Sequence, residues 1–137
     1  MRFYPEGREK GYVALDLGPT GKLLKPLGEL DFEEAYDAYY EQAQALAEAG
    51  ADCLIIETSI DIQEMRAALL ATREACTLPV ICQLSYSEDG RTVTGTDPQT
   101  AAITLDALGA DIIGINCSLG PEQLVPLVKI LAENTDK

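Results

Sequence analysis

Four short apolar segments, separated by stretches with helical periodicity, constrain the fold of this 137-residue chain more than any other feature. The segments are residues 12–17, 53–57, 79–84 and 111–116. Each is a continuous apolar run that is long enough for one strand only, which is typical of strands buried on both faces of a parallel sheet. The pattern therefore predicts an α/β fold built from four strand–helix units, (βα)4.

The predicted helices between these strands have recognisable ends. Their starts are marked by Asp31 with Glu34, Asp61 with Glu64, Asp97-Pro98 and Gly120-Pro121. The first two pairs have the spacing of a capping box, and the other two place proline at the first helical position, where its missing N–H is not needed. Gly50 and Gly109 stand in similar segments and are each predicted to end a helix in the left-handed conformation.

Four strand–helix units amount to half of a (β/α)8 barrel of the TIM type, for which about 250 residues is typical. Half of a barrel leaves two free sheet edges and one uncovered face. The chain is therefore a piece of something longer, or it dimerises, or it rearranges to an open sheet, and the sequence alone favours none of the three. Residues 1–10 contain no element that the pattern places, so the partial barrel domain is assigned to residues 11–137.

Composition excludes several classes of function. The formal charge of −13, from 23 acidic and 10 basic residues, argues against nucleic acid and anionic membranes as partners. No apolar run approaches the roughly 18 residues of a membrane helix, and the N-terminus lacks the apolar core of a signal peptide, so a cytoplasmic protein is expected. The chain has no histidine, which excludes Ser-His-Asp and Cys-His catalysis and leaves thiolates and carboxylates as metal ligands.

Two strand ends carry candidate functional residues. Asn116-Cys117 closes the last predicted strand, at the edge of a parallel sheet where active sites are built. A thiol at this place serves as a nucleophile, as a metal ligand or as a small buried filler. Glu57 closes the second predicted strand, and its charge needs a partner. The carboxylate binds a substrate ammonium, or it caps the next helix or pairs with a neighbour such as Arg66.

Together these segments resemble the homocysteine S-methyltransferase family, most closely the N-terminal homocysteine-binding module of bacterial cobalamin-dependent methionine synthases. The resemblance covers roughly residues 11 to 135 and lies in four segments: Val13 to Leu24, Ala49 to Thr58, Gly95 to Pro98, and Gly114-Ile115-Asn116-Cys117. The Gly-x-Asn-Cys segment is the most specific of the four, because in that family its cysteine is one of three thiolates that bind zinc.

The resemblance implies a TIM-type barrel that transfers a methyl group to the thiolate of homocysteine and so forms methionine. In that family Zn²⁺ is held by three cysteines and keeps a fourth position for the substrate sulfur. By resemblance Cys117 is the first zinc ligand, Glu57 holds the amino group of homocysteine, and Asn116 belongs to the substrate-binding set. Methylcobalamin, carried by another methionine synthase domain, is the possible methyl donor.

The chain departs from the family where the other two zinc ligands are expected. They normally lie in a Gly-Gly-Cys-Cys segment near the end of the barrel, and the sequence has no such segment. Of the remaining cysteines, Cys53 and Cys82 fall inside predicted strands and Cys76 near a helix end. The chain also enters at what corresponds to the third strand of the barrel. We therefore interpret it as an internal fragment with an incomplete zinc site, inactive without the remaining barrel segments.

Two other hypotheses are open at this stage. One is a half-barrel that dimerises and acts as a non-catalytic binding module. The other is a different (β/α) enzyme that uses Cys117 as a nucleophile. Without histidine, only a lysine, an arginine or the N-terminus of the helix predicted to begin near Pro121 is available to stabilise a reactive thiolate.

Overall fold

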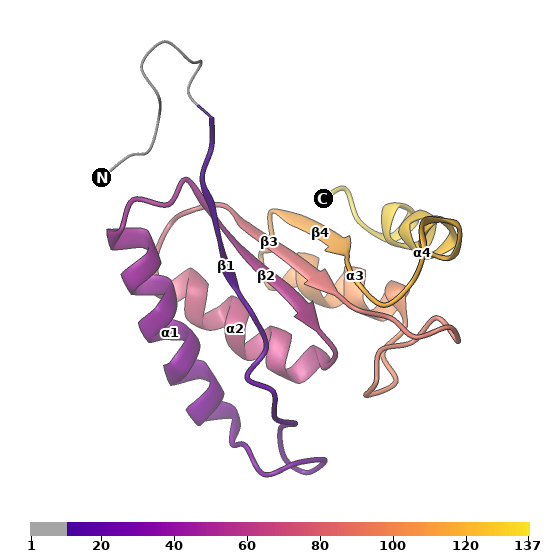
Figure 1. Ribbon diagram of the computed structural model, residues 1–137, viewed down its shortest axis with the longest axis horizontal. Helices are drawn as coiled ribbons and strands as arrows, with labels where there is room; N and C mark the ends of the chain where they lie inside the picture. Colours follow the sequence, from indigo (N-terminus) through magenta and orange to yellow (C-terminus); the bar gives the residue numbers. More distant parts are fainter. Residues whose placement is uncertain (1–10) are drawn as a thin grey trace.

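The computed structural model describes residues 11–137, and within this range strands and helices alternate as the sequence predicts (Figure 1). The strands are β1 (Ala14–Leu17), β2 (Cys53–Ser59), β3 (Val80–Leu84) and β4 (Ile112–Ile115). The helices are α1 (Phe32–Glu48), α2 (Ile62–Ala75), α3 (Pro98–Ala107) and α4 (Pro121–Asn134). The prediction that residues 1–10 carry no element falls outside the described residues.

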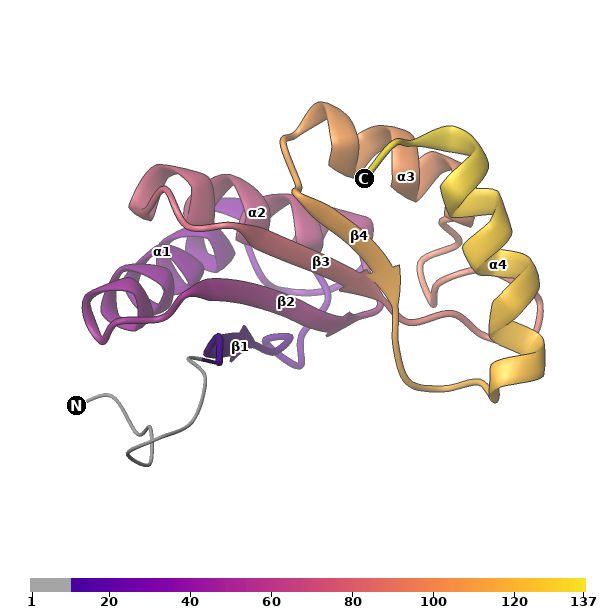
Figure 2. The same ribbon diagram turned by 90° about the horizontal axis from the view of Figure 1, so that it is seen from above.

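The four strands form one parallel sheet whose spatial order, β1-β2-β3-β4, is the order of the sequence. Crossovers between parallel strands are right-handed, so a sheet that always grows in one direction receives its connecting helices on one face. Figure 2 shows α1, α2 and α3 on the same side of the sheet. The arrangement is the predicted α/β half-barrel, with β1 and β4 as its edges.

The core lies between the sheet and these helices. The covered face of the sheet carries five side chains that are at most 1% exposed: Leu54, Ile56, Val80, Cys82 and Leu84. Because side chains alternate along a strand, the intervening residues Ile55, Ile81 and Gln83 point to the other face, where they are partly exposed. The uncovered face that the half-barrel model predicts is therefore present.

The helix ends follow the sequence signals with one exception. The backbone N–H of Asp31 donates to Glu34 Oε2 at 3.3 Å, as in the predicted capping box. At α2, Asp61 accepts from the backbone N–H of Gln63 at 2.9 Å, but the Glu64 side chain does not return to Asp61. Glu64 instead binds Thr20 in the loop between β1 and α1. A tertiary contact has replaced the local one.

The predicted glycine caps are present. Gly50 and Gly109 follow α1 and α3 with φ angles of +93° and +89°. Both lie in the left-handed region that glycine enters without a steric penalty. No helix within residues 11–137 has the length and apolar character needed to cross a membrane.

Candidate functional site

The carboxyl ends of β2 and β4 bring the three predicted site residues into one cluster. Asn116 follows β4, and its Nδ2 donates to Oε2 of Glu57, in β2, at 3.1 Å. Between these two strands, at the end of β3, the Ser85 hydroxyl donates to the backbone oxygen of Asn116 at 2.9 Å. Glu57, Asn116 and the adjoining Cys117 therefore meet at the edge of the sheet where parallel α/β folds place their sites.

The orientation of the Asn116 amide is fixed by the backbone. Its Oδ1 accepts from the backbone N–H of Thr58 at 3.0 Å, so its Nδ2 must face the opposite side. There Nδ2 lies 2.8 Å from the Thr58 hydroxyl and 3.5 Å from Cys117 Sγ, in addition to its bond to Glu57. Both the oxygen and the nitrogen of the amide thus contact protein groups, and the amide fixes the positions of Glu57 and Cys117 relative to each other.

Thr58 is a site residue that the sequence did not indicate. Its φ of +58° is rare for a β-branched residue, and Cys117 and Ser118 both have φ of +60°. The pairing of β2 with β3 shifts register between Ile56 and Ser59, which is where Thr58 lies. Backbone strain of this kind clusters at functional sites. The Thr58 hydroxyl lies 3.5 Å from Cys117 Sγ and so completes the cluster.

The four cysteines differ sharply in their suitability as metal ligands. Cys117 is exposed at the carboxyl edge of the sheet. Cys82 points into the core, where burial raises the pKa of its thiol to about 12 and so disfavours the thiolate that a metal needs. Cys53 begins β2 and Cys76 caps α2, which places both at the opposite end of the parallel sheet. Cys117 is therefore suited to supply one thiolate.

No complete metal site is present in the part of the chain that the structure describes. Residues 11–137 contain no group of three or more His, Cys, Asp or Glu side chains placed to hold one ion. The Cys117 sulfur is of the ligand type that zinc prefers. Its side-chain neighbours, Thr58 and Asn116, are neutral hydrogen-bonding groups, so they would not repel a bound metal ion. A metal held here needs ligands from outside residues 11–137.

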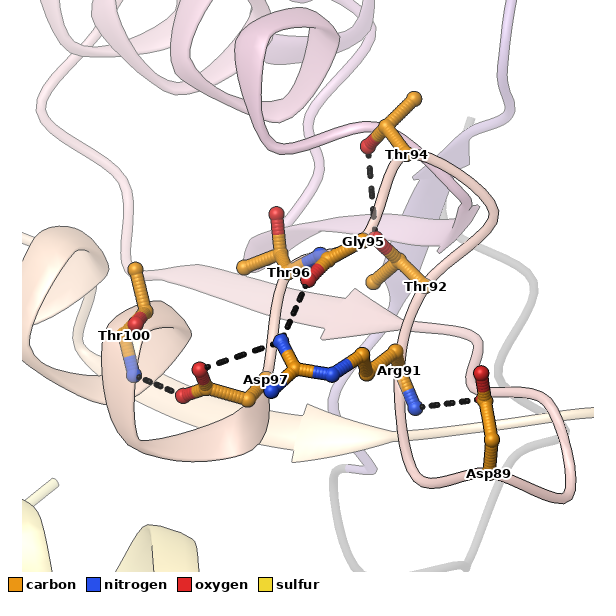
Figure 3. A network of polar contacts seen from close by, with 8 residues as sticks. All are labelled: Asp89, Arg91, Thr92, Thr94, Gly95, Thr96, Asp97 and Thr100. Atoms are coloured by element: carbon orange, nitrogen blue, oxygen red, sulfur yellow. Dashed lines mark hydrogen bonds and ion pairs between the residues drawn. The ribbon is translucent and has the colours of Figure 1, made fainter.

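The loop between β3 and α3 is held together by a network of polar contacts (Figure 3). Arg91 Nη1 donates to the backbone oxygen of Gly95 at 2.8 Å and lies 3.5 Å from Asp97. Asp97 caps α3, and the backbone N–H of Thr100 holds the pKa of its carboxyl below the usual value. The backbone N–H of Thr94 reaches Ile60 O, in the turn that follows Glu57, at 3.4 Å.

Comparison with known proteins shows the family to which the chain belongs. Residues 2–137 match the family model described as homocysteine S-methyltransferase. The chain belongs to this family. It is similar to the methionine synthases of Mycobacterium leprae (strain TN), with 32% identity over 130 residues, and of Mycobacterium tuberculosis (strain ATCC 25618 / H37Rv), with 33% identity over 120 residues. The matches cover 91% and 84% of this chain, which spans about a tenth of each relative, 11% and 10%.

A solved structure of a homocysteine methyltransferase shows the same fold. The crystal structure of the homocysteine methyltransferase MmuM from Escherichia coli, in its apo form, superposes with a TM-score of 0.77 at 22% sequence identity. The match covers 90% of this chain and 45% of that protein. The share agrees with the interpretation of the four units as half of a barrel.

This member of the homocysteine S-methyltransferase family has a pocket of about 290 Å³ beside the cluster. Its walls are formed by Pro19, Gly21, Lys22, Leu23, Thr58, Ile60 and Glu64. Thr58 belongs to both the pocket and the Cys117 cluster. The pocket lies between the β1–α1 loop and the end of β2, and its surface is largely apolar.

Proposed function

We propose that residues 11–137 are part of a homocysteine-binding barrel domain that transfers a methyl group to the homocysteine sulfur and so forms methionine. The observation that carries the proposal is the cluster of Glu57, Asn116, Thr58 and Cys117 at the carboxyl edge of a family-typical half-barrel. The methionine synthases that it resembles support the reaction. The remaining strands come from barrel segments outside residues 11–137.

Three residues of the cluster have a direct role in this proposal. Glu57 binds the ammonium group of homocysteine, because a partly buried carboxylate at a strand end needs a cationic partner. Asn116 contributes to substrate binding by orienting the Glu57 carboxylate through its 3.1 Å hydrogen bond. Cys117 supplies one zinc thiolate. Zinc, when bound, would keep the substrate thiol deprotonated at neutral pH.

The same proposal makes the isolated chain inactive. Two further thiolates are needed, and the placement of Cys53, Cys76 and Cys82 away from Cys117 supports a source outside this chain. Methylcobalamin, carried by another domain of a methionine synthase, is the proposed methyl donor. The partners are therefore homocysteine, the remaining barrel segments and the other methionine synthase domains. The proposal also places the domain in the cytoplasm.

The test is reconstitution. The chain is co-produced with the complementary barrel segments of a family member that carry the two further thiolates, and the zinc content and methionine formation of the complex are measured. We expect about one zinc per complex, and we expect Cys117→Ser to remove most of it. Cys76→Ser is the matched control, because Cys76 lies at the far end of α2 and its loss should leave the zinc content unchanged.

Two outcomes would contradict the proposal. Zinc content that does not change in Cys117→Ser would remove Cys117 from the metal site. A stable homodimer of the chain that binds its ligand equally well after Cys117→Ser would favour the alternative, a dimerising half-barrel that serves as a binding module. The mass of the particle in solution, measured by light scattering on the chain without added segments, separates these cases.

A further inference from the structure

Glu64 is a buried carboxylate that the proposed methyl transfer does not use. It is 2% exposed, and its Oε1 accepts hydrogen bonds from the Thr20 backbone N–H at 2.7 Å, the Thr20 hydroxyl at 2.6 Å and the Tyr39 hydroxyl at 3.1 Å. Burial and the neighbouring Glu64 carboxylate raise the pKa of the Tyr39 hydroxyl, so Tyr39 keeps its proton and acts as a donor. Every one of these donors is neutral.

The second oxygen of this carboxylate is open to the pocket. Among residues 11–137, no hydrogen bond or ion pair reaches Glu64 Oε2. The side-chain oxygens and nitrogens of this range that are fully enclosed without a partner are Thr72 Oγ1 and Tyr86 OH. Oε2 is not one of them, so it keeps some exposed surface, and we place this surface in the 290 Å³ pocket because Glu64 lines that pocket. A buried carboxylate oxygen without a donor is costly, which points to a ligand that supplies one.

The walls of the pocket determine which donor fits. Pro19, Leu23 and Ile60 give the pocket a largely apolar surface, which is unfavourable for a hydrated metal ion. The Glu64 carboxylate adds a site for a cationic N–H donor, and charge-assisted bonds of this type are roughly twice as strong as neutral ones. A carboxylate at one wall and a largely apolar surface elsewhere, with Lys22 and Thr58 as the other polar lining residues, match an ammonium group that carries an alkyl chain.

We propose that this pocket binds a primary alkylammonium group, with an N–H donated to Glu64 Oε2 and the alkyl chain packed on Leu23 and Ile60. The site is distinct from Glu57, which is the proposed partner of the homocysteine ammonium. Thr58 lines the pocket and also contacts Cys117 Sγ, so a ligand bound there lies next to the candidate reaction centre. The inference needs neither zinc nor methyl transfer.

The test uses the intact 137-residue chain, labelled with ¹⁵N and titrated with n-butylammonium in phosphate buffer, because Tris is itself a primary ammonium ion. The amide signals of Gly21, Thr58 and Ile60 report on the pocket. We expect saturable shifts with n-butylammonium and at least about tenfold weaker binding of 1-butanol, its neutral match. Equal responses to the two compounds, or shifts that do not saturate, would overturn the proposal even if no variant folds.

Four variants sharpen the result. Glu64→Gln should remove the preference for the cation, whereas Glu41→Gln, an exposed carboxylate of α1, should keep it. Glu57→Gln should also keep it, and loss of binding there would place the amine at the homocysteine site instead. Lys22→Met addresses the lysine at the pocket rim. If butylammonium binds only after Lys22→Met, then Lys22 fills the pocket itself and the proposal is wrong.

Discussion

The helices α2 and α4 are each 14 residues long, yet they are embedded in the molecule to very different extents. Seven residues of α2 are buried: Glu64, Met65, Ala67, Ala68, Leu69, Ala71 and Thr72. In α4 only Leu131 is buried. Helix α2 lies under the middle of the sheet, whereas α4 follows the edge strand β4 (Figure 1). These equally long helices are therefore expected to contribute unequally to stability, because α2 packs against α1, β2 and β3, whereas α4 packs against α3 and the edge strand β4.

The helices α2 and α4 also differ in their polar contacts. Arg73, in the last turn of α2, donates to the backbone oxygens of Leu78 and Gly109 and to Asp111, which ties α2 to the start of β4. Helix α4 instead contains an internal proline, Pro126, which removes one backbone hydrogen bond. Its Val125 and Val128 are about half exposed. Cys117 is therefore followed along the chain by α4, the helix with the fewest buried residues of the four.

The largest expected loss of stability follows from a substitution in α2. Met65 is completely buried, so Met65→Ala leaves a cavity and should lower the free energy of unfolding by about 2–5 kcal/mol. Urea denaturation followed by circular dichroism measures this loss. A cost below about 1 kcal/mol would mean that the α2 core is no better packed than α4, and the comparison would fail.

Leu131→Ala should come next, at the low end of the same range, about 2 kcal/mol, since Leu131 is 4% exposed and is the single buried residue of α4. Hydrogen exchange should show faster exchange along α4 while the amides of α2 stay protected. Loss of protection in both helices together would show that α2 and α4 unfold as one unit.

A smaller effect is expected from acid. Arg73 and the backbone N–H of Val80 hold the pKa of the Asp111 carboxyl below its ordinary value of 3.8. The stabilisation is therefore complete above the unfolded pKa and is lost as the pH falls through the lower folded pKa. Because Asp111 is half exposed, Asp111→Asn should reduce stability at pH 7 by less than about 1 kcal/mol. The free energy of unfolding, measured from pH 7 down to about pH 2, should fall less steeply below about pH 4 for the variant than for the unaltered chain.

The smallest expected effect is on the outer face of α4. Val128 is 48% exposed, so Val128→Thr should change the free energy of unfolding by no more than about 0.5 kcal/mol. A larger loss that grows with protein concentration would show that a second chain covers this face. Thr77→Val, on an exposed residue between α2 and β3, serves as a control for the chemistry of the exchange.

Local patterns in the sequence predict the elements of this fold well. The four apolar runs contain or overlap the four strands, and the caps at Asp31, Asp61, Asp97 and Gly120 begin the four helices. These signals depend on residues within a few positions of one another, so they can be recognised in the sequence without knowledge of the tertiary structure. The family resemblance, carried by the same segments, is confirmed.

The contacts inside the site could not be predicted in this way. Thr58 and Asn116 are 58 residues apart, and Thr20 and Glu64 are 44 apart. Glu64 shows the reason: its local spacing from Asp61 predicts a capping box, but the β1–α1 loop offers it two donors at once. Thr58, which has a left-handed backbone, likewise donates its N–H to Asn116, just after β4, and no local pattern contains this partner.

The order of the strands in the sheet has a consequence for synthesis. Because each strand pairs with the one made just before it, every new strand–helix unit finds its docking surface already in place as the chain leaves the ribosome. Pairing between consecutive strands keeps the sequence separation of the contacts as small as a parallel sheet allows, which favours faster folding. By the same order of pairing, β4 has a free edge when it leaves the ribosome. That edge can pair with the next strand of a barrel, or with a strand of another chain.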